Sequence, residues 1–381
     1  MIRTVAAAVA AMAPAACAPL SPPSPPLPVV VTAPDSVPRP TVRAWPAMGG
    51  LLQVSVWDAD TARALAAMEA ARAAVLHADS LTSAEKAGSE IAAVNRRAGT
   101  DSATTLSPWT AEVLDSALSI AASSSGALDV TSTPLDSLWA TWRERAAPPP
   151  QAERDAAETL VGWRQVRFDR ATRRASLPRQ GMRLDLGVLA RGFAIDRGID
   201  ALRAAGVERA VVDLGGSFAV LGAAPVESRW SMGLGNPFQL GEVFAAVQVD
   251  SGAVATWTDV PGTIETDGQR FAHTLDPRTR FLTRGIASVS VLAPSALLAD
   301  ALSQAFFVMG PAEGCRLAAR YPGVDVVWVR DPGEELEEDY DADEGVDPEL
   351  VVITDALADR LELLSEEPTD ERPTRCSELA R

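Results

Sequence analysis

The stretch Arg183-Leu-Asp-Leu-Gly-Val-Leu-Ala-Arg-Gly-Phe-Ala-Ile-Asp196 decides the fold, because a polar glycine turn here joins two apolar runs. Met182–Leu186 predicts a strand, and Ala190–Ala205 has the apolar spacing of a helix. A second strand is expected at Ala210–Leu214, directly before Gly215-Gly-Ser217. Glycine lets a backbone approach a phosphate closely, and a helix N-terminus favours an anion. The stretch therefore predicts a binding site for a phosphate-bearing ligand.

Elements of both kinds are predicted on either side of this stretch. Helices are expected at Thr61–Leu81, Ser89–Arg97, Ser107–Ser123, Pro134–Trp139, Ser295–Met309, Pro311–Tyr321 and Asp355–Leu364. Strands are expected at Leu51–Trp57, in a hairpin over Val166–Leu177, in short segments up to Thr258, and at Val324–Val329 paired with Leu350–Thr354. This order predicts an α+β fold of mixed and antiparallel sheets flanked by helices, with a ligand cleft between its two halves.

The composition is that of a large globular protein with an acidic surface. The 381 residues are 47% apolar and 22% charged, and the formal net charge is −17. Ten acids and no base lie within Asp331–Asp347, which we interpret as a solvated loop between two paired strands. An acidic surface repels nucleic acid, so no nucleic-acid partner is expected.

The N-terminal segment predicts export and a lipid anchor. Residues 1–17 combine Arg3, a short apolar run and small residues before Cys17, which is typical of a lipoprotein signal peptide. The alternative is an ordinary secretory signal with a chance cysteine. Residues 18–44, rich in proline, are expected to form a tether. The functional domain is then expected at 45–364 and an unstructured tail at 365–381. The protein is predicted to be a membrane-anchored lipoprotein that faces the periplasm or the cell exterior.

Cysteine and histidine are too few for a metal cluster. Beyond Cys17 only Cys315 and Cys376 remain, so no disulfide framework is predicted, and Cys315 is interpreted as a small buried apolar residue. Of the two histidines, His77 is expected to be a surface residue of a helix. His273 ends a short strand, where it could exchange a proton with a hydroxyl nucleophile.

Two aspartates each allow a functional and a structural interpretation. Asp300 interrupts an apolar helix, so it either binds a cation such as Mg²⁺ or lies on an exposed face. Asp185 either belongs to the ligand site or caps a turn. Arg191, near the start of the helix predicted at Ala190–Ala205, could face a phosphate.

These segments together resemble the FAD:protein FMN transferase (ApbE-like, thiamine biosynthesis lipoprotein) family over about Ala47–Leu364. The motifs that carry the resemblance are Ala47-Met-Gly49, Ser89-Glu-Ile-x-x-x-Asn95, Ser125-Gly-Ala-Leu-Asp129, Pro134-Leu-x-x-Leu-Trp139, Asp185-Leu-Gly-x-x-Ala-Arg-Gly192, Asp213-Leu-Gly-Gly216, Ala253-Val-Ala-Thr256, His273-x-x-Asp-Pro-Arg-Thr279 and Val289-Ser-Val to Gly310-Pro311. The resemblance implies a T-fold-like flavin transferase fold. The implied enzyme uses Mg²⁺ to move FMN from FAD to a threonine or serine of an acceptor flavoprotein, releasing AMP.

The resemblance also implies the site residues. His273 lies where the family has its catalytic histidine, which also contacts the flavin nucleotide. The residues that match positions lining or supporting the FAD site are Met48, Asn95, Asp129, Trp139, Asp185 and Arg191. The implied Mg²⁺ ligands are Asp300, the carbonyl of Ala190 and the residue four after Asp300, here Gln304.

Several positions near the expected site differ from the family pattern. Ser217 replaces an Asp, Trp257-Thr258 replaces Ser-Gly, Arg280 replaces a Gly, and Gln304 replaces a Thr. Two alternative functions are therefore kept beside the transferase: an FAD pyrophosphatase that yields FMN and AMP, and an FAD-binding protein with impaired catalysis.

Overall fold

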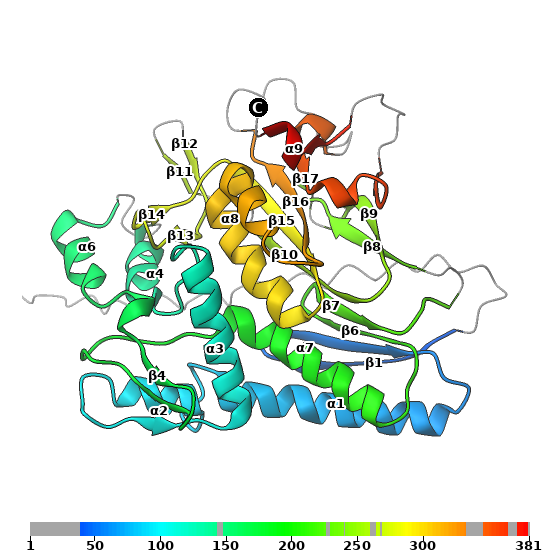
Figure 1. Ribbon diagram of the computed structural model, residues 1–381, viewed down its shortest axis with the longest axis horizontal. Coiled ribbons are helices and arrows are strands. Elements are labelled where there is room, and N and C mark those ends of the chain that lie inside the picture. The colour runs from blue at the N-terminus through cyan, green and yellow to red at the C-terminus, as the bar shows by residue number, and fades with distance from the viewer. Residues whose placement is uncertain are drawn as a thin grey trace, which may run out of the picture.

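A nine-stranded sheet forms the centre of the computed structural model, which describes residues 39–142, 148–225, 229–239, 241–259, 264–266, 269–332, 346–364 and 372–379 (Figure 1). In spatial order the strands are β1 (Thr41–Ala47), β2 (Gly50–Val56), β6 (Ala210–Leu214), β7 (Ser217–Leu221), β10 (Gly252–Thr258), β15 (Ile286–Ala293), β16 (Asp325–Arg330), β17 (Val351–Ile353) and β19 (Thr374–Arg375). Neighbouring strands are antiparallel except β17 and β19, which are parallel.

Helices and smaller sheets surround this centre. The helices are α1 (Thr61–Thr82), α2 (Glu90–Arg96), α3 (Pro108–Ser123), α4 (Thr133–Ala140), α6 (Gln151–Glu158), α7 (Gly187–Ala204), α8 (Ala296–Ala318) and α9 (Cys376–Leu379), with 3₁₀ turns at Trp163–Gln165, Pro348–Leu350 and Asp355–Leu357. The small sheets are β18 (Leu361–Leu363)–β9 (Val243–Val249)–β8 (Trp230–Gly235), β3 (Thr104–Thr105)–β5 (Arg174–Ser176)–β4 (Arg167–Asp169), β11 (Ile264–Thr266)–β12 (Gln269–Phe271) and β13 (Leu275–Asp276)–β14 (Phe281–Leu282). The predicted α+β fold of mixed and antiparallel sheets flanked by helices is confirmed.

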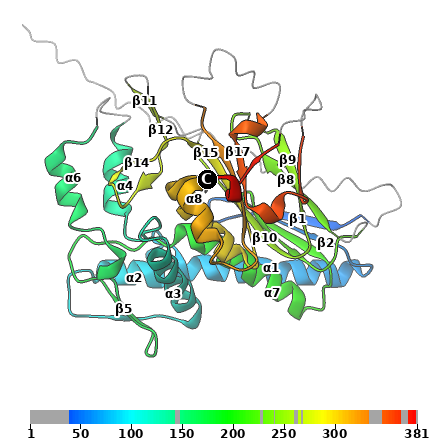
Figure 2. The same cartoon turned by 45° about the horizontal axis from the view of Figure 1, so that its top comes forward.

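The central sheet is covered on both faces, which explains why all eight residues of β15 are buried. Helices α1, α7 and α8 pack on one face over the largest apolar cluster. The sheet β18–β9–β8 covers the other face through a second cluster that includes Trp230 and Phe244. A third cluster, around Trp139 and Phe281, joins α4 to β13 and β14 at one end of the molecule (Figure 2).

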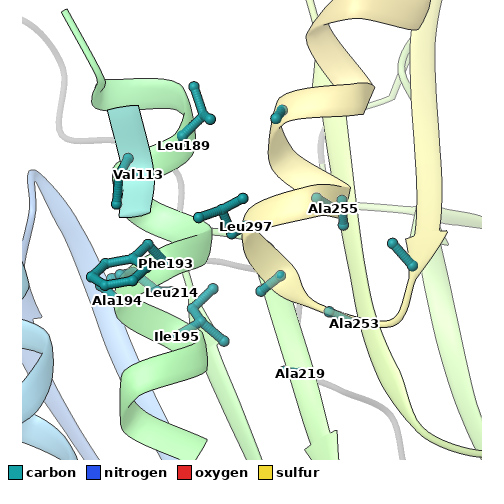
Figure 3. Packing of buried hydrophobic residues seen from close by; sticks show 14 of the residues in the cluster. Val113, Leu189, Phe193, Ala194, Ile195, Leu214, Ala219, Ala253, Ala255 and Leu297 are labelled. Atoms are coloured by element: carbon teal, nitrogen blue, oxygen red, sulfur yellow. The ribbon is translucent and has the colours of Figure 1, made fainter. Parts of the chain in front are cut away.

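Helices α7 and α8 approach each other closely, and this contact fixes the relative position of the candidate site residues that the two helices carry. Figure 3 shows Leu297 of α8 directed at the α7 residues Leu189, Phe193 and Ile195. A Cβ atom on Gly192 would lie 2.1 Å from the carbonyl oxygen of Ala296, so only glycine fits here. The arrangement of α8 beside α7 therefore depends on the absence of a single side chain.

Substitution of Gly192 by alanine is expected to lower the free energy of unfolding by about 3 kcal/mol, because the new methyl group meets rigid backbone. Gly198→Ala on the same helix is the matched control. Its Cβ would lie 3.5 Å from Val75 and 3.6 Å from Val212, which is ordinary contact. It should stabilise the helix by about 0.5–1 kcal/mol. Urea unfolding of both variants checks this, and equal stabilities would contradict the close crossing.

Most predicted helices are present, including the break near Gly310, whose positive φ of 65° interrupts α8 before Pro311. The strand predicted at Met182–Leu186 is wrong. The side chain of Asn95 takes the place of a partner strand: Leu184 N donates to Asn95 Oδ1 (2.7 Å), and Asn95 Nδ2 donates to Leu184 O (2.9 Å). Helix α7 begins at Gly187, three residues earlier than predicted.

The C-terminal predictions are wrong in two places. The helix expected at Asp355–Leu364 is a 3₁₀ turn followed by β18, which pairs with β9 because Leu361 and Leu363 alternate as strand residues do. The tail expected to be unstructured contains β19 and α9, and a disulfide joins Cys315 to Cys376. The absence of a disulfide was therefore also wrongly predicted. Residues 1–38, 333–345 and 365–371, which hold the predicted signal, most of the tether, most of the acidic loop and the start of the tail, lie outside the described residues.

Candidate active site

A pocket of about 1010 Å³ opens where the β1–β2 turn, the end of α1, the loop before α4 and the start of α7 meet. Its lining residues are Pro46–Gly50, Leu76, Asp79, Thr82–Lys86, Leu128–Val130, Ser132, Thr133, Asp136, Asp185, Gly187–Arg191, Trp257 and Gln304. Six of the predicted site residues, namely Met48, Asp129, Asp185, Ala190, Arg191 and Gln304, thus lie around one cavity. Asn95, Trp139, His273 and Asp300 are not part of its lining.

Two tight hairpin turns lie side by side near this pocket. Met48 (φ 49°) and Gly49 (φ 77°) connect β1 to β2, and Gly215 (φ 64°) and Gly216 (φ 91°) connect β6 to β7. Two positive φ angles in a two-residue loop are typical of a type I′ turn. The Gly215 amide donates to Leu51 O (3.2 Å), which ties the turns together. The Gly-Gly pair is therefore a hairpin turn.

The start of α7 is fixed from both sides. Asp185 Oδ1 accepts a hydrogen bond from Gly187 N (2.8 Å), and Asp185 N donates to Val130 O (2.8 Å). Together with the two hydrogen bonds between the Asn95 side chain and the Leu184 main chain, these bonds fix the position of Ala190 and Arg191 in the pocket wall. Asp185 therefore both lines the pocket and forms the turn, so the two interpretations of this residue are compatible.

Asp129 forms a second rigid part of the wall. Its Oδ1 accepts from Thr131 N (2.8 Å) and Thr131 Oγ1 (2.6 Å), and its Oδ2 accepts from Trp163 N (3.0 Å). Burial raises the pKa of Asp129 above its usual value, and these hydrogen bonds oppose the rise. The carboxylate holds the loop that leads from α3 to α4.

Asp300 is only 5% exposed, so its alternative placement on an exposed helix face is wrong. Burial raises its pKa to about 6, although the charge of Arg191 and hydrogen bonding from Ser217 and the Gly192 main chain act in the opposite direction. The Ser217 hydroxyl donates to Asp300 Oδ1 (2.6 Å). The other oxygen, Oδ2, is buried with no hydrogen-bond partner among the described residues.

A buried carboxylate oxygen without a donor is the feature expected of a cation ligand. Gln304 lies one helical turn after Asp300 and lines the pocket together with Ala190, so an amide oxygen and a main-chain carbonyl are available nearby. Oxygen ligands of this kind suit Mg²⁺. The described residues contain no group of three or more His, Cys, Asp or Glu side chains placed to hold a metal. The residues present fit a metal that uses one carboxylate and keeps other positions for water or substrate.

His273 is paired with an aspartate that the sequence did not reveal. The side chain of His273 is 56% exposed, and its Nδ1 contacts Oδ1 of Asp259, whose side chain is 1% exposed. Asp259 Oδ2 accepts from Thr274 N (2.7 Å), which fixes the carboxylate. A carboxylate at Nδ1 leaves Nε2 as the basic nitrogen of the neutral ring. Trp257 lines the pocket and donates to Thr274 Oγ1 (2.9 Å), which connects the pocket to the histidine segment.

Trp139 packs against the turn that follows the His273 segment. The ring is buried and packs edge-on against Phe281, with centroids 4.7 Å apart, and its Nε1 donates to Arg280 O (3.1 Å). Arg280 has a φ of 64°, a left-handed conformation in which glycine is favoured. The Arg280 side chain contacts Glu158 of α6. Trp139 thus positions the turn that follows His273.

Known proteins are similar to this chain in sequence and in fold. The chain matches the ApbE family over residues 48–328. It is 33% identical to the FAD:protein FMN transferase of Treponema pallidum over 304 residues, which covers 75% of this chain and 83% of that protein. The Haemophilus influenzae protein of the same name is 30% identical and covers 62% of this chain and 70% of its own length.

Solved structures agree with the sequence relatives. The ApbE protein of Thermotoga maritima superposes with a TM-score of 0.68 at 26% identity, covering 77% of this chain and 96% of its own. The Pseudomonas stutzeri flavinyl transferase ApbE superposes with a TM-score of 0.65 at 28% identity, covering 78% of this chain and 93% of its own. With the family matched over most of the described fold, the chain belongs to the ApbE family.

Proposed function

We propose that this protein transfers FMN from FAD to a threonine or serine hydroxyl of an acceptor protein, uses Mg²⁺, and releases AMP. The observation that carries the proposal is the buried Asp300 Oδ2, which has no hydrogen-bond partner in the part of the chain that the structure describes and lies beside a pocket that Arg191 and Gln304 line. A diphosphate needs positive charge around it. The pocket wall holds the acids Asp79, Glu85, Asp129, Asp136 and Asp185 against Lys86 and Arg191, and a bound cation would offset this excess of negative charge.

Each predicted residue has a distinct task in this proposal. Met48, Asp129, Asp185 and Arg191 line the FAD site, and Arg191 offers a guanidinium to the diphosphate. Asn95 and Trp139 support it without contacting the pocket. Asp300, Gln304 and the carbonyl of Ala190 would hold Mg²⁺. When bound, Mg²⁺ neutralises the diphosphate and polarises its phosphorus–oxygen bonds.

His273 serves as the general base. The acceptor hydroxyl oxygen forms a bond to the phosphorus of the FMN half, and the bond from that phosphorus to the bridging oxygen breaks. The hydroxyl proton passes to His273 Nε2, and AMP leaves with the bridging oxygen. Asp259 stabilises the imidazolium that results, because its buried carboxylate faces Nδ1.

Product analysis separates this function from its alternatives. The purified protein is incubated with FAD and Mg²⁺, with and without an acceptor that a related transferase flavinylates, and AMP and free FMN are quantified by chromatography. AMP that forms only with acceptor supports transfer. AMP and free FMN without acceptor would identify a pyrophosphatase. FAD binding with neither product would identify an FAD-binding protein.

The affinity for Mg²⁺ is expected to decrease about fivefold between pH 6 and pH 5, because a proton and the metal compete for Asp300. The folded-state pKa of about 6 is raised above the usual 3.8. In the metal-free protein this carboxylate therefore costs stability progressively as pH rises from about 4 to about 6. Thermal shifts caused by Mg²⁺ should be small at pH 5 and reach a plateau above pH 7. Equal shifts at pH 5 and pH 7.5 would contradict this role for Asp300.

We further propose that the protein is exported and attached to a membrane through Cys17, with a flavoprotein acceptor in the same compartment. The disulfide between Cys315 and Cys376 supports this location, because disulfides persist in oxidising compartments. Among the described residues no helix is long and apolar enough to cross a bilayer.

A further inference from the structure

The two carboxylate oxygens of Asp300 have different surroundings. Oδ1 accepts the Ser217 hydroxyl at 2.6 Å, whereas Oδ2 is buried without a hydrogen-bond partner in the described part of the chain. Hydrogen bonding from the Gly192 main chain also favours the charged form of this carboxylate. Oδ2 itself has no partner at normal hydrogen-bond geometry in the described part of the chain. One oxygen is therefore held by the protein, and the other is left available.

The Ser217 hydroxyl, which is the donor to Asp300, is itself buried and fixed in position. Ser217 is the first residue of β7 and is 2% exposed, so its hydroxyl cannot exchange Asp300 for bulk water. The type I′ turn before it is closed by the Leu214–Ser217 pair and by a hydrogen bond from Gly216 N to Asp213 Oδ1 (3.1 Å). The hydroxyl therefore enters the site from a short, well-defined hairpin.

A metal-binding carboxylate usually needs such a partner. A free carboxylate rotates about its Cβ–Cγ bond, and a hydrogen bond to one oxygen fixes the direction of the other. A hydroxyl provides this bond without adding charge. A second carboxylate at 2.6 Å could supply no such donor while ionised, and it would repel Asp300 before the cation arrives. Serine at position 217 thus suits a site in which one carboxylate binds the metal through one oxygen.

We propose that Ser217 is a positioning residue that orients Asp300 so that Oδ2 alone binds Mg²⁺. This proposal rests on the metal site of the proposed function, and it concerns affinity for the metal itself. Loss of the Ser217 hydroxyl should therefore weaken metal binding even when no flavin is present.

The test is isothermal titration of the FAD-free protein with Mg²⁺ at pH 7.5. Ser217→Ala is expected to weaken Mg²⁺ binding about 10- to 100-fold, the usual effect of removing a partner of a metal ligand. Ser303→Ala is the matched control. Its hydroxyl is equally buried and donates to the main-chain oxygen of Asp300 (2.8 Å), so it leaves the carboxylate alone. Its Mg²⁺ affinity should stay within about twofold of the natural chain.

A second pair of variants keeps the test decisive if Ser217→Ala folds poorly. Ser217→Thr retains the hydroxyl, and Ser217→Val has the shape of the threonine variant without the hydroxyl. Only the threonine variant should keep a near-natural affinity for Mg²⁺. Equal affinity of the threonine and valine variants, or an unchanged affinity of Ser217→Ala, would overturn the role of Ser217 while leaving the transferase intact. A natural chain that binds no Mg²⁺ would overturn both the metal site and this inference.

Discussion

Replacement of Asp300 by asparagine is expected to reduce Mg²⁺-dependent FMN transfer roughly 1,000-fold, because about 4 kcal/mol of charge stabilisation leaves with the metal ligand. The variant keeps the shape of the side chain but not its charge. Burial raises the pKa of Asp300 to about 6, so the metal-free variant should be at least as stable as the natural chain at pH 7.5. Single-turnover transfer rates and thermal unfolding with and without Mg²⁺ measure both effects.

Asp325→Asn provides the control for Asp300. Asp325 is likewise largely buried but lies on β16 of the central sheet, and its Oδ2 pairs with Arg360 at 3.0 Å, away from the pocket. Its loss should lower stability and leave the transfer rate unchanged within about twofold. The opposite pattern, a stable Asp325→Asn protein and an active Asp300→Asn protein that still responds to Mg²⁺, would remove Asp300 from the chemistry.

Replacement of His273 by alanine is expected to slow transfer about 100- to 10,000-fold, the usual contribution of a general base. FAD and Mg²⁺ binding should change little, because His273 is not part of the pocket lining. Asp259→Asn should slow transfer as well, since it removes the charge that stabilises the protonated ring. Transfer rates at saturating FAD, measured from pH 5.5 to pH 9, separate loss of the base from loss of binding.

The other histidine of the chain is the matched control. His77 lies on α1 against Trp109, with ring centroids 5.0 Å apart, and has no place in the pocket. His77→Ala should transfer FMN at a rate within about twofold of the natural chain. If His273→Ala retained the natural rate and pH profile, another group would have to accept the hydroxyl proton.

The sequence predicted the parts of the site that depend on local pattern. Asp185 beside Gly187 predicts either a turn-capping or a ligand-site residue, and its carboxylate both accepts from Gly187 N and lines the pocket. Asp300 could be identified as a candidate because a charge in an apolar helix costs free energy unless it is paired or binds a cation. The apolar periods of α1, α3 and α7 were equally clear. Such features are decided within a few residues of the chain.

Features that depend on distant segments could not be predicted in this way. The Asp259–His273 pair forms across an intervening hairpin, and its only sequence signal is an acid at the end of a strand. The disulfide needs the C-terminal segment to fold back onto α8, which no local pattern announces. Asn95 replaces a strand partner for Leu184 from 89 residues away. Tertiary contacts decided each of these cases.

The departures from the family pattern have physical explanations at three positions. Arg280 keeps the left-handed backbone that a glycine would adopt, with a φ of 64°. Trp257 remains in the pocket wall and is tied to Thr274. Ser217 bonds directly to Asp300. Each of these three residues therefore has a structural role in or beside the site.

The most direct test of this account is the intact mass of an acceptor protein after incubation with the enzyme, FAD and Mg²⁺, compared with the same reaction in EDTA. The acceptor is expected to gain the mass of one FMN in the first reaction and none in the second, with the addition on its threonine or serine. An acceptor whose mass is unchanged with Mg²⁺ present, although FAD is bound, would contradict the proposed FMN transfer.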